Sequence, residues 1–219
     1  MTDNDPRVVD NPEAGRFEVL VGREVAGFAE YQRTKSAVAF THTVIDPAFE
    51  GRGLGSALAR GALDAERARI REAHLKPVGA RPQPTARGLH HTALISSDVE
   101  TTVRFYQDVL GFPLTELIEN RDYPGPSHFF FDIGNGNLVA FFDFPGLDVG
   151  SYAEVLGGLH HMAISVEPER WEALVQRLTD AGVPHEVHSG VSVYFRDPDG
   201  ARIELIADPL GEMYGQHVL

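Results

Sequence analysis

The pattern of apolar and polar positions repeats itself in the second half of the chain. Residues 88–96 read Gly-Leu-His-His-Thr-Ala-Leu-Ile-Ser, and residues 158–166 read Gly-Leu-His-His-Met-Ala-Ile-Ser-Val. Each copy begins as a short apolar run, typical of a strand, and passes through an acidic stretch into a helical period. The helices are predicted over 99–110 and 168–181, and a glycine follows each of them, as is common at helix C-termini. The two copies therefore share one layout.

Three more strand patterns follow the helix in each copy. Turn sequences separate the last two strands, Gly-Asn-Gly-Asn at 134–137 and Asp-Pro-Asp-Gly at 197–200. The predicted strands are 114–118, 128–133, 138–142, 184–188, 191–196 and 202–206. Each copy is thus a predicted βαβββ module, which assigns the chain to the α+β class. Two such modules placed edge to edge would form a curved eight-stranded sheet around one cavity.

The first third of the chain has a different pattern, and its elements are predicted as strands over 17–21, 25–31 and 37–45 and a helix over 56–72. Prolines and glycines gather between this helix and the repeat, which is linker composition. The expected divisions are a flexible tail at 1–13, an α+β segment at 14–75, a linker at 76–87, a repeat half at 88–210 with modules 88–147 and 157–210, and a C-terminal tail at 211–219.

The composition limits the metal ligands and the compartment. The 219 residues include no cysteine, so any metal has to be held by His, Asp or Glu. No apolar run approaches the roughly 18 residues that a membrane span needs. The first residues lack the basic start and apolar core of a signal peptide. We therefore expect a cytoplasmic protein without a membrane partner.

The net charge of -13 is concentrated in residues 88–219, where Asp and Glu outnumber Lys and Arg by 20 to 6. An acidic surface repels a phosphate backbone. Nucleic acid is therefore not an expected partner, and a small-molecule substrate is.

Strand alternation indicates which side chains of the repeat face the cavity. In the second copy the bulky Met162 and Ile164 share one face, which leaves His161 on the other; the repeat gives the same orientation to His91. Glu204 lies between two apolar neighbours and also faces the cavity. Two imidazoles and one carboxylate suit Fe(II) or Mn(II) with open positions, and Zn(II) is also possible. The neighbouring His90 and His160 are expected to support these ligands or to pack.

The repeat, together with the closing Asp-Pro-Asp-Gly-x-x-Ile-Glu-Leu, resembles the vicinal oxygen chelate family over residues 88–210. This family includes glyoxalase I, extradiol dioxygenases, fosfomycin-resistance enzymes and bleomycin-binding proteins. The resemblance implies that His91, His161 and Glu204 are metal ligands. Glyoxalase I and methylmalonyl-CoA epimerase carry a fourth ligand where Ala140 stands here. The sequence therefore sides with the three-ligand members, the dioxygenases and the fosfomycin-resistance enzymes.

Tyr194 and His188 are the candidate catalytic residues. Extradiol dioxygenases place a Tyr at this spacing before the ligand Glu and a His upstream, as acid–base partners of the substrate hydroxyls. A further dioxygenase His, expected near 134–137, has no counterpart here. Apolar lining of the pocket is expected from a set of aromatic residues, Phe129, Phe131, Phe141 and Tyr123.

The first segment resembles the small GNAT acetyltransferases in its turn before the helix, Glu-Gly-Arg-Gly-Leu-Gly at 50–55. The resemblance makes Arg52, Gly53 and Gly55 candidates for a coenzyme A loop. However, Glu50 stands where the family has Arg or Gln, and the linker replaces the strand that completes the coenzyme cleft. We expect a truncated module kept for docking or solubility, and we favour acetyl-CoA binding and acetyl transfer less.

The expected function is that of a divalent-metal enzyme acting on a small substrate with vicinal oxygens, most like an extradiol-type dioxygenase. Alternatives are a bleomycin-resistance-like binding module, a lyase or transferase of the same family and an N-acetyltransferase. The short connection over 144–156 suggests that both modules form one cavity within a chain. It also allows the exchange of modules between two chains of a homodimer.

Overall fold

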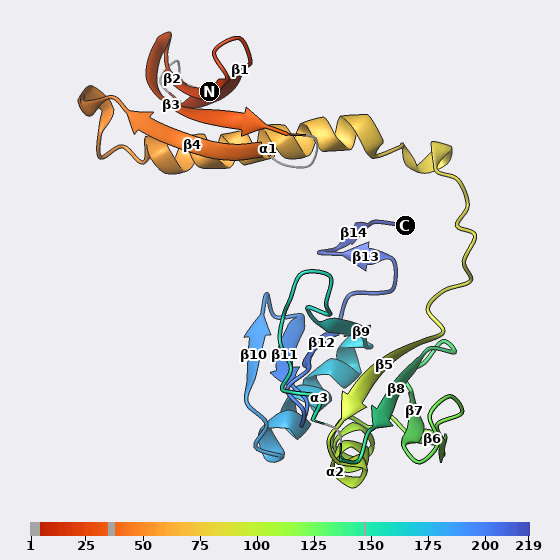
Figure 1. Cartoon of the computed structure of the whole chain (residues 1–219). Helices are drawn as coiled ribbons and strands as arrows, with labels where there is room; N and C mark the ends of the chain where they lie inside the picture. The colour runs from red at the N-terminus through yellow and green to blue at the C-terminus, as the bar shows by residue number, and fades with distance from the viewer. Residues whose placement is uncertain (1–4, 35–37, 147) are drawn as a thin grey trace. The chain divides into compact units, whose positions relative to one another are not determined.

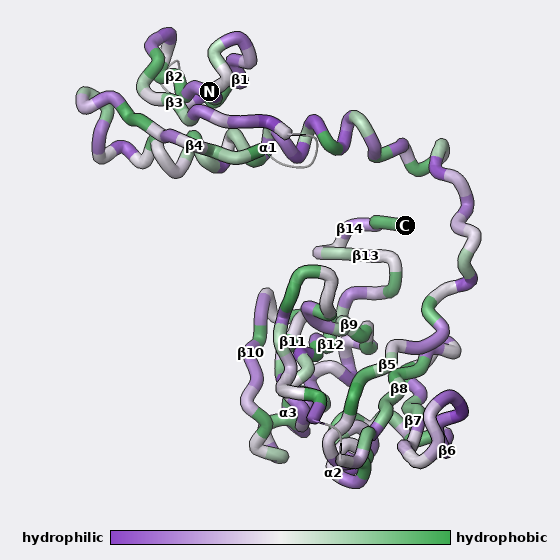
Figure 2. Tube along the Cα trace, viewed as in Figure 1, coloured by the Kyte–Doolittle hydropathy of each residue, from purple (hydrophilic) through white to green (hydrophobic). Residues whose placement is uncertain are grey.

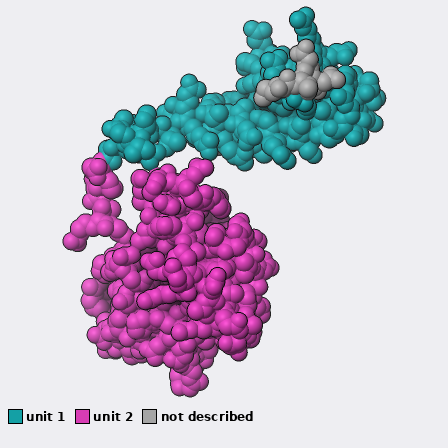
Figure 3. All heavy atoms as spheres, turned by 180° about the vertical axis from the view of Figure 1, so that it is seen from behind, with its two compact units in different colours: residues 1–82 teal, residues 83–219 magenta. Residues whose placement is uncertain are grey.

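The computed structural model describes residues 5–34, 38–146 and 148–219. The chain divides into two compact units, Met1–Pro82 and Gln83–Leu219, which Figure 3 distinguishes by colour. The division falls inside the segment predicted as a linker.

The first unit is an antiparallel sheet covered by one long helix (Figure 1). Its strands lie in chain order, as the meander pattern predicted. The elements are β1 (Arg7–Asn11), β2 (Arg16–Val21), β3 (Glu24–Arg33), β4 (Val38–Ile45), a 3₁₀ turn at Pro47–Phe49 and α1 (Leu54–His74). Apolar side chains of the sheet, such as Phe17 and Val19, form a core with Leu58 of the helix.

The segment predicted as a flexible tail contains β1, which pairs with β2 from Arg7 to Asn11. The prediction for 1–13 was wrong over these residues because the turn that follows was not recognised. The Asn11 side chain accepts a hydrogen bond from the Ala14 amide, and Gly15 takes a positive φ of 63°. An Asn at the start and a Gly at the end are typical of a turn that folds a strand back on its neighbour.

The second unit consists of two βαβββ modules, which confirms the predicted repeat. Module 1 contains β5 (His91–Ser96), α2 (Val99–Val103), β6 (Leu114–Glu119), β7 (Ser127–Asp132) and β8 (Leu138–Asp143). Module 2 contains β9 (Met162–Ser165), α3 (Pro168–Asp180), β10 (His185–His188), β11 (Ser192–Arg196) and β12 (Arg202–Ile206). The sheet orders are β5-β8-β7-β6 and β9-β12-β11-β10, so the two modules have the same topology. The strand β10 is an edge strand and is drawn mostly in hydrophilic colours in Figure 2.

The helix of module 1 differs from its prediction in geometry. The α-helix ends at Val103, and π-helical turns continue it from Arg104 to Val109 before Gly111 ends the segment. The wider turn places Phe105 and Tyr106 together in the core. A π-helical segment of this kind inserts an extra residue into a helix, which an apolar period does not reveal.

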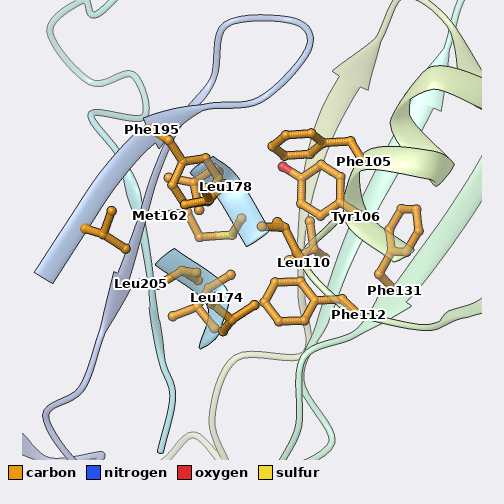
Figure 4. Close-up of a cluster of buried hydrophobic side chains, with 14 of the residues drawn as sticks. Phe105, Tyr106, Leu110, Phe112, Phe131, Met162, Leu174, Leu178, Phe195 and Leu205 are labelled. Carbon is orange, nitrogen blue, oxygen red and sulfur yellow. The ribbon is translucent and has the colours of Figure 1, made fainter. Parts of the chain in front are cut away.

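The helix-facing sides of both sheets share one hydrophobic core. Figure 4 shows Tyr106 and Phe131 of module 1 facing the cluster that Met162, Leu178 and Leu205 form in module 2. The two sheets therefore lie on either side of a common core. In the described residues of one chain they remain two four-stranded sheets, and the predicted eight-stranded sheet is not formed there. The faces of the sheets that carry the predicted ligands point away from the shared core.

The C-terminal segment is not a plain tail, as was expected for 211–219. It forms a short hairpin of β13 (Glu212–Met213) and β14 (Gln216–His217). The Tyr214 amide at its tip donates a hydrogen bond to the Asp208 side chain, 2.8 Å away.

A buried hydrogen bond joins the two modules. The Tyr106 hydroxyl donates to Asp197 at 3.0 Å, and Asp197 also accepts from the backbone amides of Asp199 and Ala201. Burial raises the pKa of Asp197 above its ordinary 3.8, while these donors lower it. The turn sequence at 197–200 therefore anchors module 2 on the helix of module 1.

Tyr106→Phe is expected to destabilise the fold by roughly 1–3 kcal/mol, because it removes a donor from a buried acceptor. The cost should grow with pH. Since the folded-state pKa of Asp197 lies above its unfolded value, ionisation of this group costs folding free energy as the pH rises through the folded pKa. Urea unfolding at pH 4 and pH 7.5 measures both effects. An equal cost at both pH values would contradict the role of the Asp197 charge.

Candidate functional site

His161 and Glu204 meet on the outer face of the module 2 sheet. The parallel pairing of β9 with β12 sets Ala163 beside Glu204, so that the His161 ring reaches the carboxylate. The His161 Nε2 atom lies 3.1 Å from Glu204 Oε2. Glu204 is 5% exposed although it is a carboxylate, and such burial is costly unless the charge is partnered. Alternation thus predicted the orientation of both side chains correctly.

Two side chains of β11 complete the surroundings of Glu204. The Ser192 hydroxyl donates a hydrogen bond of 2.6 Å to Glu204 Oε1. Tyr194 is paired with Glu204 across the sheet and hydrogen-bonds to its side chain. Burial and this carboxylate raise the pKa of Tyr194 to about 12. The phenol therefore keeps its proton and acts as a donor at neutral pH.

His188 and Arg202 flank Tyr194 on the same face. The His188 ring meets the Tyr194 ring edge-on with centroids 5.3 Å apart, and its Nε2 atom lies 3.4 Å from Glu186. The Arg202 guanidinium lies 4.9 Å from the centre of the Tyr194 ring. The structure therefore brings together four of the predicted residues, His161, His188, Tyr194 and Glu204.

The two His pairs have the same internal geometry. The Nδ1 atoms of His90 and His91 are 2.8 Å apart, and those of His160 and His161 are 2.7 Å apart. In each pair one ring donates and the other accepts. This contact occupies Nδ1 of His91 and of His161, and leaves the Nε2 atom of each ring for another partner. A neighbour that fixes ring orientation is what metal-binding histidines commonly have.

The structure does not bring His91 to the other two predicted ligands. The His91 ring is exposed and contacts His90, His128 and Phe130, all of module 1. Within residues 5–34, 38–146 and 148–219, no three His, Asp or Glu side chains are grouped closely enough to hold a metal. The expectation of one cavity within a single chain is therefore not met. The physical reason is the shared core, which turns the two ligand faces away from each other.

The sheet register supports the predicted absence of a fourth ligand. In module 1 Ala93 is the neighbour of Ala140, as Ala163 is the neighbour of Glu204 in module 2. Ala140 therefore occupies the position that corresponds to Glu204.

The expected aromatic lining was assigned to the wrong face. Phe129, Phe131 and Phe141 are fully buried in the shared core, and Tyr123 is 61% exposed. The residues that alternate with them on the same strands, Phe130 and Phe142, lie on the face that carries His91. The alternation that places His91 on this face applies equally to β7 and β8, and through the sheet register it assigns Phe130 and Phe142 to the same face.

Three residues near the candidate site were missed, namely Ser192, Arg202 and His128. Each is an even number of positions from Tyr194, Glu204 or Phe130 on the same strand. Two-residue alternation was the signal that could have identified them.

A groove of about 1000 Å³ lies between the two modules. Its walls include Asn135 and Asn137 from the β7–β8 turn, and Arg177 from α3. His161, Tyr194 and Glu204 do not line it. A smaller hollow of about 420 Å³ contains Tyr194 and Arg202.

The candidate coenzyme A loop lies where it was predicted, before α1. Gly53 has a positive φ of 72° at the helix start, and the Arg52 guanidinium lies over the Phe49 ring. Gly55 lies inside the first turn of the helix. In the described part of the first unit no strand follows α1, which agrees with the expected truncation of the coenzyme cleft. The expectation that acetyl-CoA is not bound stays a prediction.

None of the helices in the described residues is long and apolar enough to cross a membrane.

Two family models match the chain, one in each unit. The model of the Glyoxalase/Bleomycin resistance protein/Dioxygenase superfamily matches residues 88–205, and the GCN5-related N-acetyl-transferase model matches residues 16–76. These matches confirm both resemblances.

Relatives in other organisms cover the second unit. The protein provisionally named as the ring-cleaving dioxygenase MhqA of Bacillus subtilis (strain 168) is 28% identical over 142 residues, which are 58% of this chain and 42% of the relative. The chain thus spans less than half the length of this relative. The metallothiol transferase FosB of Shouchella clausii is 30% identical over 132 residues, 57% of this chain and 83% of the relative.

The fold has a counterpart among solved structures. A glyoxylase/bleomycin resistance protein/dioxygenase domain from Frankia sp. EAN1pec has a TM-score of 0.50 at 21% identity, over 58% of this chain and 96% of that domain. The likeness concerns the fold alone. Since the match at residues 88–205 extends over more than half of the chain and the paired modules agree with it, the protein belongs to the Glyoxalase/Bleomycin resistance protein/Dioxygenase superfamily.

Proposed function

We propose that the protein is a divalent-metal enzyme that acts on a small substrate with vicinal oxygens, most like an extradiol-type dioxygenase. The observation that carries the proposal is the buried Glu204 carboxylate beside His161. His161 is in turn the counterpart of His91 in the repeat. Fe(II) or Mn(II) is the expected metal, and Zn(II) is a third possibility.

The chemistry of the donor set fits such an ion. Glu204 is buried with one oxygen on Ser192 and the other on His161. A cation between His161 and Glu204 would compensate the buried charge at the point where their free atoms already converge. Two imidazoles and one carboxylate are a ligand set that Fe(II) and Mn(II) accept with positions left for substrate. The metal would act as a Lewis acid toward the two oxygens of the substrate.

We infer that two chains assemble the site, with His91 from one and His161 and Glu204 from the other. Both β5 and β9 are edge strands of their sheets in the described structure, and their outer faces are the ligand faces. An edge strand offers unpaired backbone groups to another chain. Pairing β5 with β9 of a second copy would create the predicted eight-stranded sheet and bring the three ligands to one side of it. A homodimer would then carry two equivalent sites.

The side chains around the ligands have distinct roles in the proposed reaction. Tyr194 keeps its phenolic proton and donates it as a hydrogen bond toward the ligand face. His188 lies against Tyr194 and is exposed enough to exchange protons with solvent. Arg202 covers the Tyr194 ring and holds positive charge beside the site.

Oxygen consumption tests the proposed reaction. Protein prepared without oxygen, loaded with Fe(II) or Mn(II) and mixed with catechol should consume oxygen when air is admitted, and Tyr194→Phe should slow the rate by about 10²-fold or more. Glu172→Gln, on the exposed face of α3, is the control and should keep the wild-type rate.

A thiol-transfer or lyase reaction at the same site is the second candidate, and the 30% identity with FosB favours it. Metal-loaded protein that consumes no oxygen but adds a thiol to an epoxide would overturn the dioxygenase assignment in favour of transfer. Metal-free sequestration of a small ligand is less favoured, because the buried Glu204 carboxylate would then lack a cation. Acetyl transfer by the first unit is less favoured because no strand follows α1 in the described part of that unit.

A further inference from the structure

Two arginines lie side by side on the ligand face of module 2, and we call them the arginine pair. Arg196 of β11 is paired with Arg202 of β12, next to the pair that Tyr194 and Glu204 form on the same two strands. Residues 88–219 contain six Lys and Arg residues against 20 Asp and Glu, so two of the six cations of this acidic half stand together. Like charges directly opposite each other destabilise a sheet. An anion between them would relieve this repulsion.

The repeat indicates that the fold itself does not require the arginine pair. In module 1 the sheet register pairs Asp132 with Leu138, and these are the positions that Arg196 and Arg202 occupy in module 2. One copy of the βαβββ module therefore forms without either arginine. The pair belongs to the module that also contains Glu204.

A carboxylate of the connection between the modules already lies at the arginine pair. Glu154 Oε1 is 3.8 Å from Arg196 and 3.9 Å from Arg202. Both distances exceed those of a charge-assisted hydrogen bond, which are about 2.7–2.9 Å. The arginine side chains remain 57% and 31% exposed. One loosely held carboxylate does not neutralise two guanidinium groups, so positive charge remains for another anion.

An open hollow gives a ligand access to the arginine pair. The hollow of about 420 Å³ is lined by both arginines, by Tyr194 and by Glu186 of β10. Glu186 is the one acidic residue of this lining, and the His188 imidazole lies 3.4 Å from it. Arg202 lies 4.9 Å from the centre of the Tyr194 ring, and Tyr194 hydrogen-bonds to Glu204. The hollow therefore connects the arginine pair with the candidate metal site.

We propose that the arginine pair binds a carboxylate group of the substrate, so that the substrate is an acid that carries this group in addition to its vicinal oxygens. The inference rests on the proposed function and deepens it by assigning the charge of the substrate. Two N–H groups of a guanidinium match the two oxygens of a carboxylate. Arg202 and Glu204 are two residues apart on one strand, roughly 6.7 Å, which a single substituted ring spans. The substrate carboxylate takes the place of Glu154 at the arginines.

Two ligands that differ in charge test this proposal. 3,4-Dihydroxybenzoate and 3,4-dihydroxybenzamide share the ring and both hydroxyls, but only the benzoate is an anion. Titration calorimetry without oxygen, on metal-loaded protein, measures the affinity for each. The ratio of benzoate affinity to benzamide affinity should fall about tenfold in Arg202→Gln, because a hydrogen bond to a charged group is lost. Benzamide binding should stay unchanged.

Glu154→Gln should change the same ratio in the opposite direction. Glu154 competes with the ligand for the arginine pair, so its neutralisation should tighten benzoate binding about threefold, as suits an exposed ion pair. A purely structural role of the pair predicts no such selective gain. Arg104→Gln is the control, because it removes an exposed arginine that pairs with Glu100 in module 1, and it should behave as wild type. Circular dichroism and metal analysis show whether each variant is folded and loaded.

The outcomes separate this inference from the proposed function. If the wild type holds no metal, the proposed function fails. Ligand-observed NMR of the benzoate on metal-free protein then decides the inference: binding that Arg202→Gln weakens supports it, and binding that the substitution leaves unchanged overturns it. On metal-loaded protein, an equal affinity ratio in wild type and Arg202→Gln would overturn it. So would a Glu154→Gln variant that binds the benzoate no more tightly than the wild type.

Discussion

Glu204→Ala is expected to lower the divalent metal content of the purified protein by at least about tenfold. Substitution of a residue that only supports a metal ligand already lowers metal affinity by about 10–100-fold. Glu204 supplies the carboxylate of the proposed ligand set, and it lies buried beside His161. Elemental analysis after loading with Mn(II) measures the effect. Equal metal in the variant and the wild type would overturn the assignment of Glu204 as a ligand.

A control is needed because the substitution also empties a buried position. Replacement by Ala leaves the Ser192 hydroxyl and the His161 ring without their partner and opens a small cavity, so the metal-free variant is expected to be less stable than the wild type. Mn(II) should then raise the melting temperature of the wild type but not of Glu204→Ala, because a ligand stabilises the state that binds it. Glu172→Gln removes an exposed charge from α3 and should respond to Mn(II) like the wild type.

The elements of the second unit were predictable because the local strand and helix patterns of one module recur in the other. The apolar runs at 91–96 and 162–165 end at helix starts, and glycines at 111 and 182 adopt the positive φ expected after a helix. The repeat then tests each assignment against a second copy. In the first unit no such copy exists, and the hairpin that Asn11 and Gly15 form was missed.

The candidate site was predictable only one module at a time. Alternation along a strand is a local property, and it correctly oriented His161 and Glu204 toward each other. The distance between His91 and these residues depends instead on which faces of the two modules share a core. That choice is decided by buried contacts such as those of Tyr106 and Leu178, which are far apart in sequence. A sequence pattern carries no direct record of them.

The arginine pair shows a second limit of pattern reasoning. Arg196 and Arg202 lie at strand ends, and charged residues at such positions are mostly exposed to solvent. Their significance comes from the register that sets them opposite each other beside Glu204, and from the different residues at the corresponding positions of module 1. Comparing the two modules position by position in the sheet register makes this difference visible.

A heterodimer of one His91→Ala chain and one Glu204→Ala chain is expected to bind about half as much metal as the wild-type dimer, because one of its two sites is intact under C2 symmetry. In that site His91 comes from the Glu204→Ala chain, and His161 and Glu204 come from the His91→Ala chain. The other site lacks both mutated groups. Each homodimer of a single variant should hold little metal. Co-expression with two affinity tags isolates the heterodimer, and elemental analysis measures the metal.

The matched control pairs His161→Ala with Glu204→Ala. Both of these substitutions lie in module 2, so each site of this heterodimer has lost one of its ligands whichever chain supplies His91. No recovery is expected, although the number of substitutions is the same. If the first heterodimer also holds no metal, the three ligands are not shared between two chains in the proposed way. Recovery in the control pair would show that His161 and Glu204 come from different chains, which their 3.1 Å contact within one sheet argues against.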